Sequence, residues 1–381
     1  MFVIPKAMRA VVYHGANDLR LETVPVPRIR PGELLVRVAV CGVCPTDIKK
    51  IQYGTVPPPR IFGHETAGTV VRAGAAVRGF EPGDRVALHH HVPCLRCHAC
   101  RHRAYAQCQQ YKRTGITAGY EPAGGGYAEY VRVMPFVLPG VVKVPRRNSL
   151  LEAAMLEPVN TVLKAVRRLR LLPGDSVWVA GQGPIGLMFT RLLALVGARV
   201  LATDLLESRL RLAREFGAKW SFRVQRPSAG DHDHPGPTAG AQFTGSRGGL
   251  EPLVERVTRG RGLDAAVVAV PSAEVMREAQ KLVRGAGQVL LFSHTKRGDE
   301  ADLDLASICV DEKDLIGSYS ADCELQSEVA RLVFTRELDT QRLITHRFAL
   351  AQTAAAIELA AHPTETSLKV VVEVAPNPQS A

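Results

Sequence analysis

The sequence predicts an α/β protein in which a doubly wound parallel sheet is joined to a β-rich unit that carries a small cysteine-rich lobe. Three observations lead to this prediction. Short β-branched runs fill the first 150 residues, strand-like and helix-like segments alternate after them, and four cysteines fall within residues 94–108. Regular alternation of strands and helices is typical of a parallel sheet with helices on both faces.

The first 150 residues are predicted to be β-rich. Their apolar runs are short, contain many β-branched residues and are separated by proline and glycine, which is the pattern of strands and turns. The predicted strands are residues 8–15, 19–27, 33–43, 65–74 and 84–92.

The alternating part of the chain ends with a return to the β-rich unit. Strands are predicted at residues 176–181, 199–204, 263–270 and 288–293, and helices at 151–169, 184–198, 207–218 and 273–287. Residues 325–338 and 350–362 are predicted helices, and 367–374 is a final strand. The Gly- and Pro-rich stretch 225–249 is predicted to be a surface loop. The loop contains residues that are either solvated or metal-binding, namely Asp231, His232, Asp233 and His234.

Composition narrows the class of protein. The chain has 381 residues, which favours two domains, and no apolar run reaches the roughly 18 residues of a membrane span. Its N-terminus lacks the apolar stretch of a signal peptide. The net charge of +11 is scattered and aromatics make up 6%, which argues against a nucleic-acid surface. Eight cysteines without secretory features indicate a reducing compartment, expected to be the cytoplasm.

A glycine motif follows the first strand of the alternating region and opens the next predicted helix. It comprises Gly181, Gly183, Pro184, Ile185 and Gly186. Glycines so placed allow a tight turn, close approach of a pyrophosphate to the backbone, and close packing of helix on strand. The following strand ends at Asp204, whose carboxylate suits ribose hydroxyls and repels a 2′-phosphate, although Arg209 would soften that repulsion. The motif therefore predicts a dinucleotide site that prefers NAD to NADP. The alternative is that the glycines form a purely structural turn and Asp204 is a surface residue.

Four cysteines with C-x2-C-x2-C-x7-C spacing predict a closed structural zinc site. They are Cys94, Cys97, Cys100 and Cys108. Four thiolates fill a tetrahedral shell, leave no position for substrate, and favour zinc because they are soft ligands. An iron–sulfur cluster is the alternative, although the spacing has no obvious iron–sulfur form. His98 and His102 are expected to be solvated because the shell is already complete.

A second group of metal-binding residue types is dispersed along the chain. It consists of Cys44, Thr46 and Asp47 in "CGVCPTD", His64 and Glu65 in "IFGHETAG", and Glu157 in "MLEPVNT". A shell of one sulfur, one imidazole and one or two carboxylates typically leaves a position open for water or substrate, as in catalytic zinc sites. Taken singly, each residue is weak support for such a site.

Together these motifs resemble the zinc-dependent medium-chain dehydrogenase/reductase family, closest to its sorbitol/polyol and threonine dehydrogenase branch. The matching strings run in the family's order over nearly the whole chain: "GVCPTD", "GHETAGTV", "GDRVA", "GGGYAEY", "GQGPIG" and "GRGLDAAVVAV". The resemblance implies a GroES-like catalytic domain at residues 1–157 with its zinc lobe at 92–110. It also implies a Rossmann NAD-binding domain at 158–321 and a return to the catalytic domain at 322–381.

The resemblance also implies a role for each residue of the dispersed group. Cys44, rather than Cys41, and His64 would bind the catalytic zinc. Glu65 is a nearby carboxylate that can enter the shell, and Asp47 would orient the His64 ring. Thr46 matches the position of the family's proton-relay hydroxyl. Thr161 matches the family position that packs near the nicotinamide.

Two departures from the common family pattern bear on the substrate and the proton path. The third ligand position, commonly cysteine in alcohol-oxidising members, is Glu157 here, which resembles the polyol branch. The position of the shuttle histidine is Lys49, expected to be a surface or relay-supporting residue. The histidines at 89–91 are expected either to contact sugar hydroxyls or to be structural.

The implied function is a zinc-dependent oxidoreductase that transfers hydride between NAD and a secondary alcohol of a polyol, sugar alcohol or cyclitol, giving a ketone. The metal would act as a Lewis acid on the substrate hydroxyl, and the proton would leave through Thr46. A threonine-type or other secondary alcohol dehydrogenase and a non-catalytic NAD- and zinc-binding protein are alternatives. One NAD, two zinc ions per chain and a homodimer or homotetramer are expected, without a nucleic-acid or membrane partner.

Overall fold

The computed structural model describes residues 2–89, 92–114, 124–225, 249–293, 295 and 298–374. Contacts divide the chain into two compact units. The β-rich unit consists of Met1–Thr161 and Ser320–Ala381, and the parallel-sheet unit of Val162–Tyr319. The sequence analysis placed the changes of domain after residues 157 and 321.

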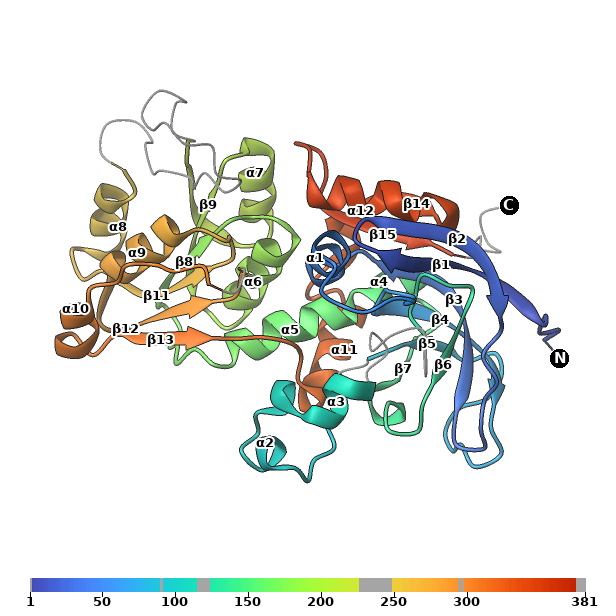
Figure 1. The fold of residues 1–381 in the computed structure, drawn as a ribbon. Helices are drawn as coiled ribbons and strands as arrows, with labels where there is room; N and C mark the ends of the chain where they lie inside the picture. The colour runs from blue at the N-terminus through green and yellow to red at the C-terminus, as the bar shows by residue number, and fades with distance from the viewer. Residues whose placement is uncertain are drawn as a thin grey trace. The chain divides into compact units, whose positions relative to one another are not determined.

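A seven-stranded sheet and a separate hairpin form the β-rich unit (Figure 1). The strands are β1 (Ala7–Gly15), β2 (Asp18–Pro25), β3 (Leu34–Gly42), β4 (Glu65–Ala73), β5 (Arg85–Ala87), β6 (Tyr130–Val133), β7 (Val142–Lys143), β14 (Ile344–Ala349) and β15 (Lys369–Glu373). The sheet order is β14-β15-β3-β4-β5-β7, with β6 paired to β3, while β1 and β2 form the hairpin. The C-terminal strand β15 runs antiparallel to β3, so the two ends of the chain build one sheet.

Helices interrupt the β-rich unit, which the sequence analysis predicted to be strands and turns up to residue 150. They are α1 (Pro45–Tyr53), α2 (His98–Arg101), α3 (Gln109–Thr114), α4 (Leu150–Ala154), α11 (Gln326–Phe334) and α12 (Thr353–Ala361), with 3-10 turns η1 (Tyr105–Gln107), η2 (Leu138–Gly140), η3 (Cys323–Leu325), η4 (Thr340–Leu343) and η5 (Leu350–Gln352). Helix α1 has recognisable signals, because Pro45 opens it and Gly54 ends it with a left-handed φ of 61°. The sequence analysis did not predict α1, because the helix follows directly after the strand-like run 33–43.

The parallel-sheet unit confirms the predicted doubly wound sheet. Its strands are β8 (Ser176–Ala180), β9 (Arg199–Asp204), β10 (Ala218–Arg223), β11 (Leu263–Val268), β12 (Val283–Leu291) and β13 (Asp314–Gly317). The order is β10-β9-β8-β11-β12-β13, and every pairing is parallel. Because the strand order reverses between β8 and β11, ligands are expected outside the carboxyl ends of these strands.

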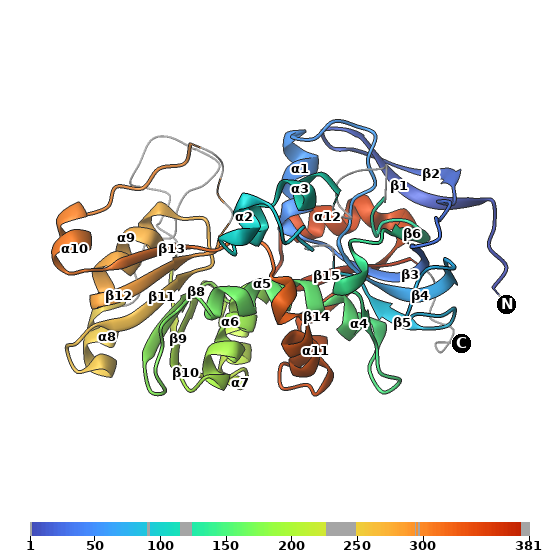
Figure 2. The same ribbon diagram turned by 90° about the horizontal axis from the view of Figure 1, so that it is seen from below.

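Helices cover both faces of the parallel sheet. They are α6 (Pro184–Leu195), α7 (Glu207–Glu215), α8 (Glu251–Thr258), α9 (Ala273–Leu282) and α10 (Leu305–Val310). Figures 1 and 2 place α6 and α7 on one face and α8 and α9 on the other. The predicted helix at 151–169 is two helices, α4 and α5 (Leu156–Val166), separated at Met155. No helix in the described part of the chain is long and apolar enough to span a bilayer.

Candidate functional site

Cys44 lies where strand β3 passes into helix α1. It is the N-cap residue of α1, with extended backbone angles of φ −106° and ψ 138°, and Pro45 takes the first helical position. The local sequence therefore places Cys44 at the point where the strand passes into the helix.

His64 and Asp47 form a buried pair next to Cys44. Asp47 lies in the first turn of α1, and its Oδ2 is 3.1 Å from Nδ1 of His64, which immediately precedes β4. Burial opposes a charge on His64, but Asp47 and Cys44 outweigh it and raise its pKa well above the usual value. Asp47 contacts one ring nitrogen of His64, and the negative groups around the ring favour a cation at this place.

Glu65 completes a compact donor set with Cys44 and His64. The ligand atoms of these three residues lie within 4.8 Å of one another. Glu65 is the first residue of β4 and is almost completely buried. One thiol, one imidazole and one carboxylate are the donors that zinc takes in proteins, so the residues present fit a zinc ion.

Glu157 is buried near this set but is not one of its three members. It is the second residue of α5, and burial raises its pKa to about 7, with Glu65 acting in the same direction and His64 opposing it. Those influences place it in the electrostatic neighbourhood of the donor set. The structure thus brings Cys44, His64 and Glu65 together and keeps Glu157 beside them as a second carboxylate.

The remaining predicted residues lie on the same helices. Thr46 and Lys49 are half-buried residues of α1, three positions apart and hence about one turn apart. Thr161 lies on α5, four residues after Glu157, and its hydroxyl donates to the Pro158 carbonyl at 2.8 Å.

Lys369 is a residue of this region that the sequence analysis missed. It is the first residue of β15, only 5% exposed, and its Nζ donates to Glu65 Oε1 at 2.6 Å and to the Val43 carbonyl at 2.9 Å. Burial disfavours its charge, but Glu65 and Cys44 outweigh burial and raise its pKa. A lysine at the start of the apolar run "KVVVEV" was the available signal, since buried lysines are rare unless paired.

The four predicted thiols of the cysteine-rich lobe gather at one point. The sulfurs of Cys94, Cys97, Cys100 and Cys108 all lie within 4.8 Å of one another. Cys97 Sγ is 3.4 Å from Cys100 Sγ, which is 3.9 Å from Cys94 Sγ. Backbone N–H groups of Arg96 and Cys97 lower the pKa of Cys94 to about 6. No disulfide forms among the eight cysteines, so the lobe fits a tetrahedral thiolate site.

The lobe has almost no apolar core of its own. Its buried cluster consists of Cys100, Tyr105 and Cys108. Glu324 in η3 ties the lobe to the C-terminal segment, since it accepts a hydrogen bond from the Tyr105 hydroxyl at 2.7 Å and pairs with Arg103. So small a cluster supports the prediction that a bound ion holds the lobe together.

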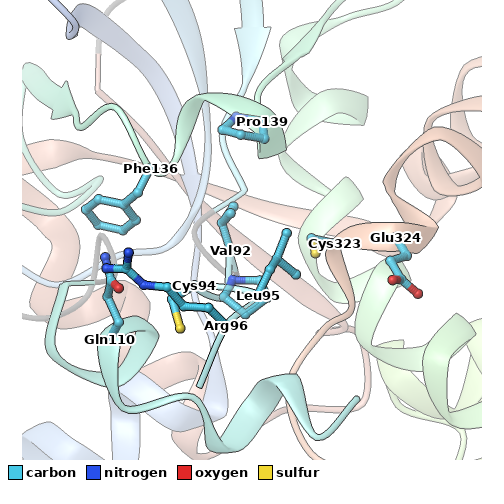
Figure 3. Close-up of a pocket in the computed structure, with 10 residues that line it drawn as sticks. Val92, Cys94, Leu95, Arg96, Gln110, Phe136, Pro139, Cys323 and Glu324 are labelled. Carbon is cyan, nitrogen blue, oxygen red and sulfur yellow. The ribbon is translucent and has the colours of Figure 1, made fainter. Parts of the chain in front are cut away.

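A cavity of about 390 Å³ lies against the lobe (Figure 3). Cys94 and Arg96 line it from the lobe, Phe136 and Pro139 from the segment around η2, and Glu324 from η3. None of Cys44, His64, Glu65 or Glu157 lines it. The cavity is therefore separate from the donor set.

The glycine motif forms the turn between β8 and α6. Gly181 has a φ of 88°, and a Cβ on Gly186 would lie 1.8 Å from the Gly181 carbonyl oxygen, so both positions require glycine. A Cβ on Gly183 would meet nothing within 4 Å. Of the three motif glycines, Gly183, the N-cap of α6, is the one that borders open space, as a pyrophosphate at the helix N-terminus requires.

Asp204 ends β9 beside this turn. Its Oδ2 accepts from the Gln182 N–H at 2.7 Å and its Oδ1 accepts from the Leu206 N–H at 2.9 Å. Arg209 lies 3.8 Å from the same carboxylate. Asp204 thus fixes the glycine turn itself, in addition to the ribose-binding role predicted for it.

Two predicted features fall partly or wholly outside the described residues. His90 and His91 are outside them, whereas His89 is completely buried and burial lowers its pKa to about 3. Of the two roles predicted for this histidine, burial favours the structural one. The four acidic and histidine residues of the predicted loop, residues 231–234, also lie outside the described part.

Comparisons with known proteins match most of the chain. Residues 30–146 match the family described as alcohol dehydrogenase GroES-like domain, and residues 184–335 match zinc-binding dehydrogenase. The sorbitol dehydrogenase of Bacillus subtilis (strain 168) is 28% identical over 97% of this chain and 98% of its own. The probable D-xylulose reductase A of Neosartorya fischeri is 32% identical over 58% of this chain and 62% of its own.

A solved structure agrees with the fold over nearly the full length. The putative zinc-binding dehydrogenase of Sinorhizobium meliloti 1021, bound to NADP, is 27% identical with a TM-score of 0.81. It covers 97% of this chain, and this chain covers 100% of it.

Proposed function

The chain belongs to the zinc-binding dehydrogenase family with an alcohol dehydrogenase GroES-like domain, and from this premise we propose that it oxidises a secondary alcohol of a polyol, sugar alcohol or cyclitol to a ketone. The observation that carries the proposal is the compact donor set of Cys44, His64 and Glu65. The full-length similarity to a sorbitol dehydrogenase supports the polyol class.

The residues around the donor set have separate tasks in this proposal. Zinc held there would supply a Lewis acid that favours the ionised form of a substrate hydroxyl. The Thr46 hydroxyl would receive the substrate's hydroxyl proton while passing its own proton to water, and Lys49, one turn further along α1, lies beside this path. Asp47 holds the His64 ring in one orientation through Nδ1.

The proposed cofactor is NAD, which supplies the hydride acceptor. Gly181, Gly183 and Gly186 form the turn for the pyrophosphate, and Asp204 takes the ribose hydroxyls, with Arg209 beside it. Asp204 brings negative charge to the place where a 2′-phosphate would lie. The structure of the Sinorhizobium meliloti relative is bound to NADP, and the ratio of Kd values for NADH and NADPH tests the choice made here.

A substrate panel read by NADH absorbance, with zinc measured on the same sample, tests the proposal. We expect turnover of sorbitol or of inositol-type cyclitols and two zinc ions per chain. Turnover of threonine alone would reject the polyol assignment. Binding of NADH and zinc without oxidation of any alcohol would indicate a binding protein instead.

We further propose a homodimer or homotetramer in the cytoplasm. Strand β13 is an edge of the parallel sheet, and Leu305 and Val310 on the neighbouring helix α10 are 76% and 79% exposed. Exposed apolar side chains beside an open strand edge support an interface between copies. Eight cysteines without a disulfide support a reducing compartment.

A further inference from the structure

We propose that Asn160 and Glu324 are positioning residues through which the cysteine-rich lobe holds Glu157 in place beside the donor set. The inference rests on the proposed function, because Glu157 belongs to the same zinc site. It assigns the lobe an effect on the alcohol site, although the three residues of the compact donor set all lie outside the lobe. The connection runs through residues 320–326, called the return segment here, in which the chain re-enters the β-rich unit.

Asn160 joins helix α5 to the return segment. Its side chain is completely buried, and both of its polar atoms are used. Oδ1 accepts from the Asp322 N–H at 2.8 Å, and Nδ2 donates to Gln326 Oε1 at 2.9 Å. Gln326 is itself buried and donates from Nε2 to the Gly140 carbonyl at 3.2 Å. Because a buried amide without partners is costly, this pairing favours a single arrangement of α5 against the segment.

Glu157 lies on the part of α5 that Asn160 fixes. It is three positions before Asn160, so the two side chains lie about one turn apart on the same side of the helix. Both are buried, and in a close-packed interior a shift of the helix moves the carboxylate with it. The position of Glu157 beside the donor set therefore depends on the contacts of Asn160.

Glu324 joins the same segment to the lobe. Its Oε1 accepts from the Tyr105 hydroxyl at 2.7 Å, and its carboxylate pairs with Arg103. The backbone N–H of Glu324 donates to Oδ1 of Asp322 at 2.9 Å. The residue whose N–H binds Asn160 is therefore hydrogen-bonded to the residue that the lobe holds.

Ser320 gives the segment a second contact beside the lobe. Its Oγ is 3.2 Å from the hydroxyl oxygen of Tyr111, a residue that packs on the lobe's buried cluster. Ser320 has a φ of 66°, a backbone conformation that residues other than glycine seldom adopt. Conformations of this kind persist where the surrounding contacts hold them. The segment is thus held on both sides of Asp322.

The lobe in turn depends on its ion. Tyr105 belongs to the lobe's buried cluster, together with Cys100 and Cys108. Because that cluster is so small, the thiols and the ion they bind decide where Tyr105 lies. The connection from the ion to the alcohol site therefore passes in order through Tyr105, Glu324, Asp322, Asn160 and Glu157.

Alanine variants of the two positioning residues test this connection in the full chain, with zinc in the lobe and cobalt in the other site. Asn148→Ala is the control for Asn160→Ala, because Asn148 is another buried asparagine, which precedes α4 and donates to the Phe334 carbonyl at 3.2 Å. Glu337→Ala is the control for Glu324→Ala. Glu337 likewise pairs with an arginine and accepts from a hydroxyl, but from Arg331 and Thr335. The readouts are the visible spectrum of the cobalt ion, kcat/KM for the alcohol, and the melting temperature.

We expect Asn160→Ala and Glu324→Ala each to shift the cobalt spectrum and to lower kcat/KM by about tenfold, the lower end of the effects produced just outside a metal shell. The two controls should keep the wild-type spectrum even where their melting temperature falls. Glu324→Gln retains an acceptor for the Tyr105 hydroxyl and should restore the wild-type spectrum. A wild-type spectrum and rate in either alanine variant would overturn the inference.

The double variant shows whether the two residues act through one connection. If they do, Asn160→Ala combined with Glu324→Ala lowers kcat/KM by about tenfold, no more than either change alone. A loss of about a hundredfold, the product of two separate effects, would show that the residues act independently and would overturn the inference.

Glu324→Ala gives an answer by itself if Asn160→Ala does not fold, because it changes a side chain that is 43% exposed. Its cobalt spectrum and the rescue by Glu324→Gln then decide the inference. Wild-type protein that oxidises no alcohol would instead reject the proposed function, while the cobalt spectra would still test the connection. The two failures are therefore distinguishable.

Discussion

Asp47 Oδ2 lies 3.1 Å from His64 Nδ1, and both side chains are buried, Asp47 on helix α1 and His64 directly before strand β4. This contact holds the His64 ring through Nδ1. It also makes the imidazole a stronger ligand, because a carboxylate on one nitrogen increases the basicity of the other.

Asp47→Asn is expected to weaken binding of the non-lobe zinc ion and to lower kcat/KM by about 10- to 100-fold. Asparagine keeps the size of the side chain but removes the charge that supports His64. Zinc content after dialysis and steady-state rates measure the effect. Asp302→Asn, on a fully exposed aspartate, is the control. Unchanged zinc content and rates in Asp47→Asn would contradict the assigned role.

Cys44→Ser and Cys97→Ser are expected to have opposite consequences. Cys44→Ser should abolish turnover with little change in melting temperature, because Cys44 lies in a unit with a large core of its own. Cys97→Ser should lower solubility or disrupt oligomerisation, because the lobe depends on its ion. Zinc per chain, melting temperature and turnover distinguish them. Wild-type rates in Cys44→Ser would show that the catalytic ligand was assigned wrongly.

Asp204→Ala is expected to narrow the preference for NAD over NADP by about tenfold, or roughly 1.4 kcal/mol. The ratio of Kd values for NADH and NADPH measures it. Since Asp204 also accepts the Gln182 and Leu206 N–H groups, the alanine variant tests charge and turn geometry together. Asp204→Asn separates them: it removes the charge, retains an acceptor oxygen, and should narrow the preference as well. An unchanged ratio in both variants would remove Asp204 from cofactor selection.

Glu152 is expected to make stability depend on acid pH. Burial opposes its charge, but Arg336 and the Ser149 N–H outweigh burial and lower its pKa from 4.5 to about 2. The stabilisation is therefore complete above about pH 4.5 and is lost as the pH falls toward 2. Glu152→Gln should lower the free energy of unfolding at pH 7 by about 1–3 kcal/mol and flatten its dependence on pH in that window. Urea unfolding at several pH values measures this, with exposed Glu255→Gln as the control.

Val310→Asp is expected to shift the protein to smaller species if α10 and the β13 edge form an interface. An aspartate there would bury an unpaired charge between copies. Light scattering or sedimentation measures the mass. Leu172→Asp changes another exposed apolar residue, 71% exposed, and should leave the mass unchanged. The same mass for both variants would place the interface elsewhere.

Local spacing made much of this molecule predictable. The glycine motif and Asp204 belong to one strand–turn–helix–strand segment, and the four lobe cysteines fall within residues 94–108. Strand β9, Arg199–Asp204, has the predicted bounds. Over such short distances the backbone geometry of turns and strands determines which residues meet, so a pattern of residue types is sufficient.

The sequence by itself determined the fold class, the family, the thiol lobe and the short strings from which the donor set is built. Tertiary structure decided that Glu65, and not Glu157, joins Cys44 and His64 in the compact set, and that Lys369 holds it. Those outcomes depend on the register of three strands from opposite ends of the chain, and on the space left by Gly42. Register follows from packing of the whole sheet, which no short stretch of sequence contains.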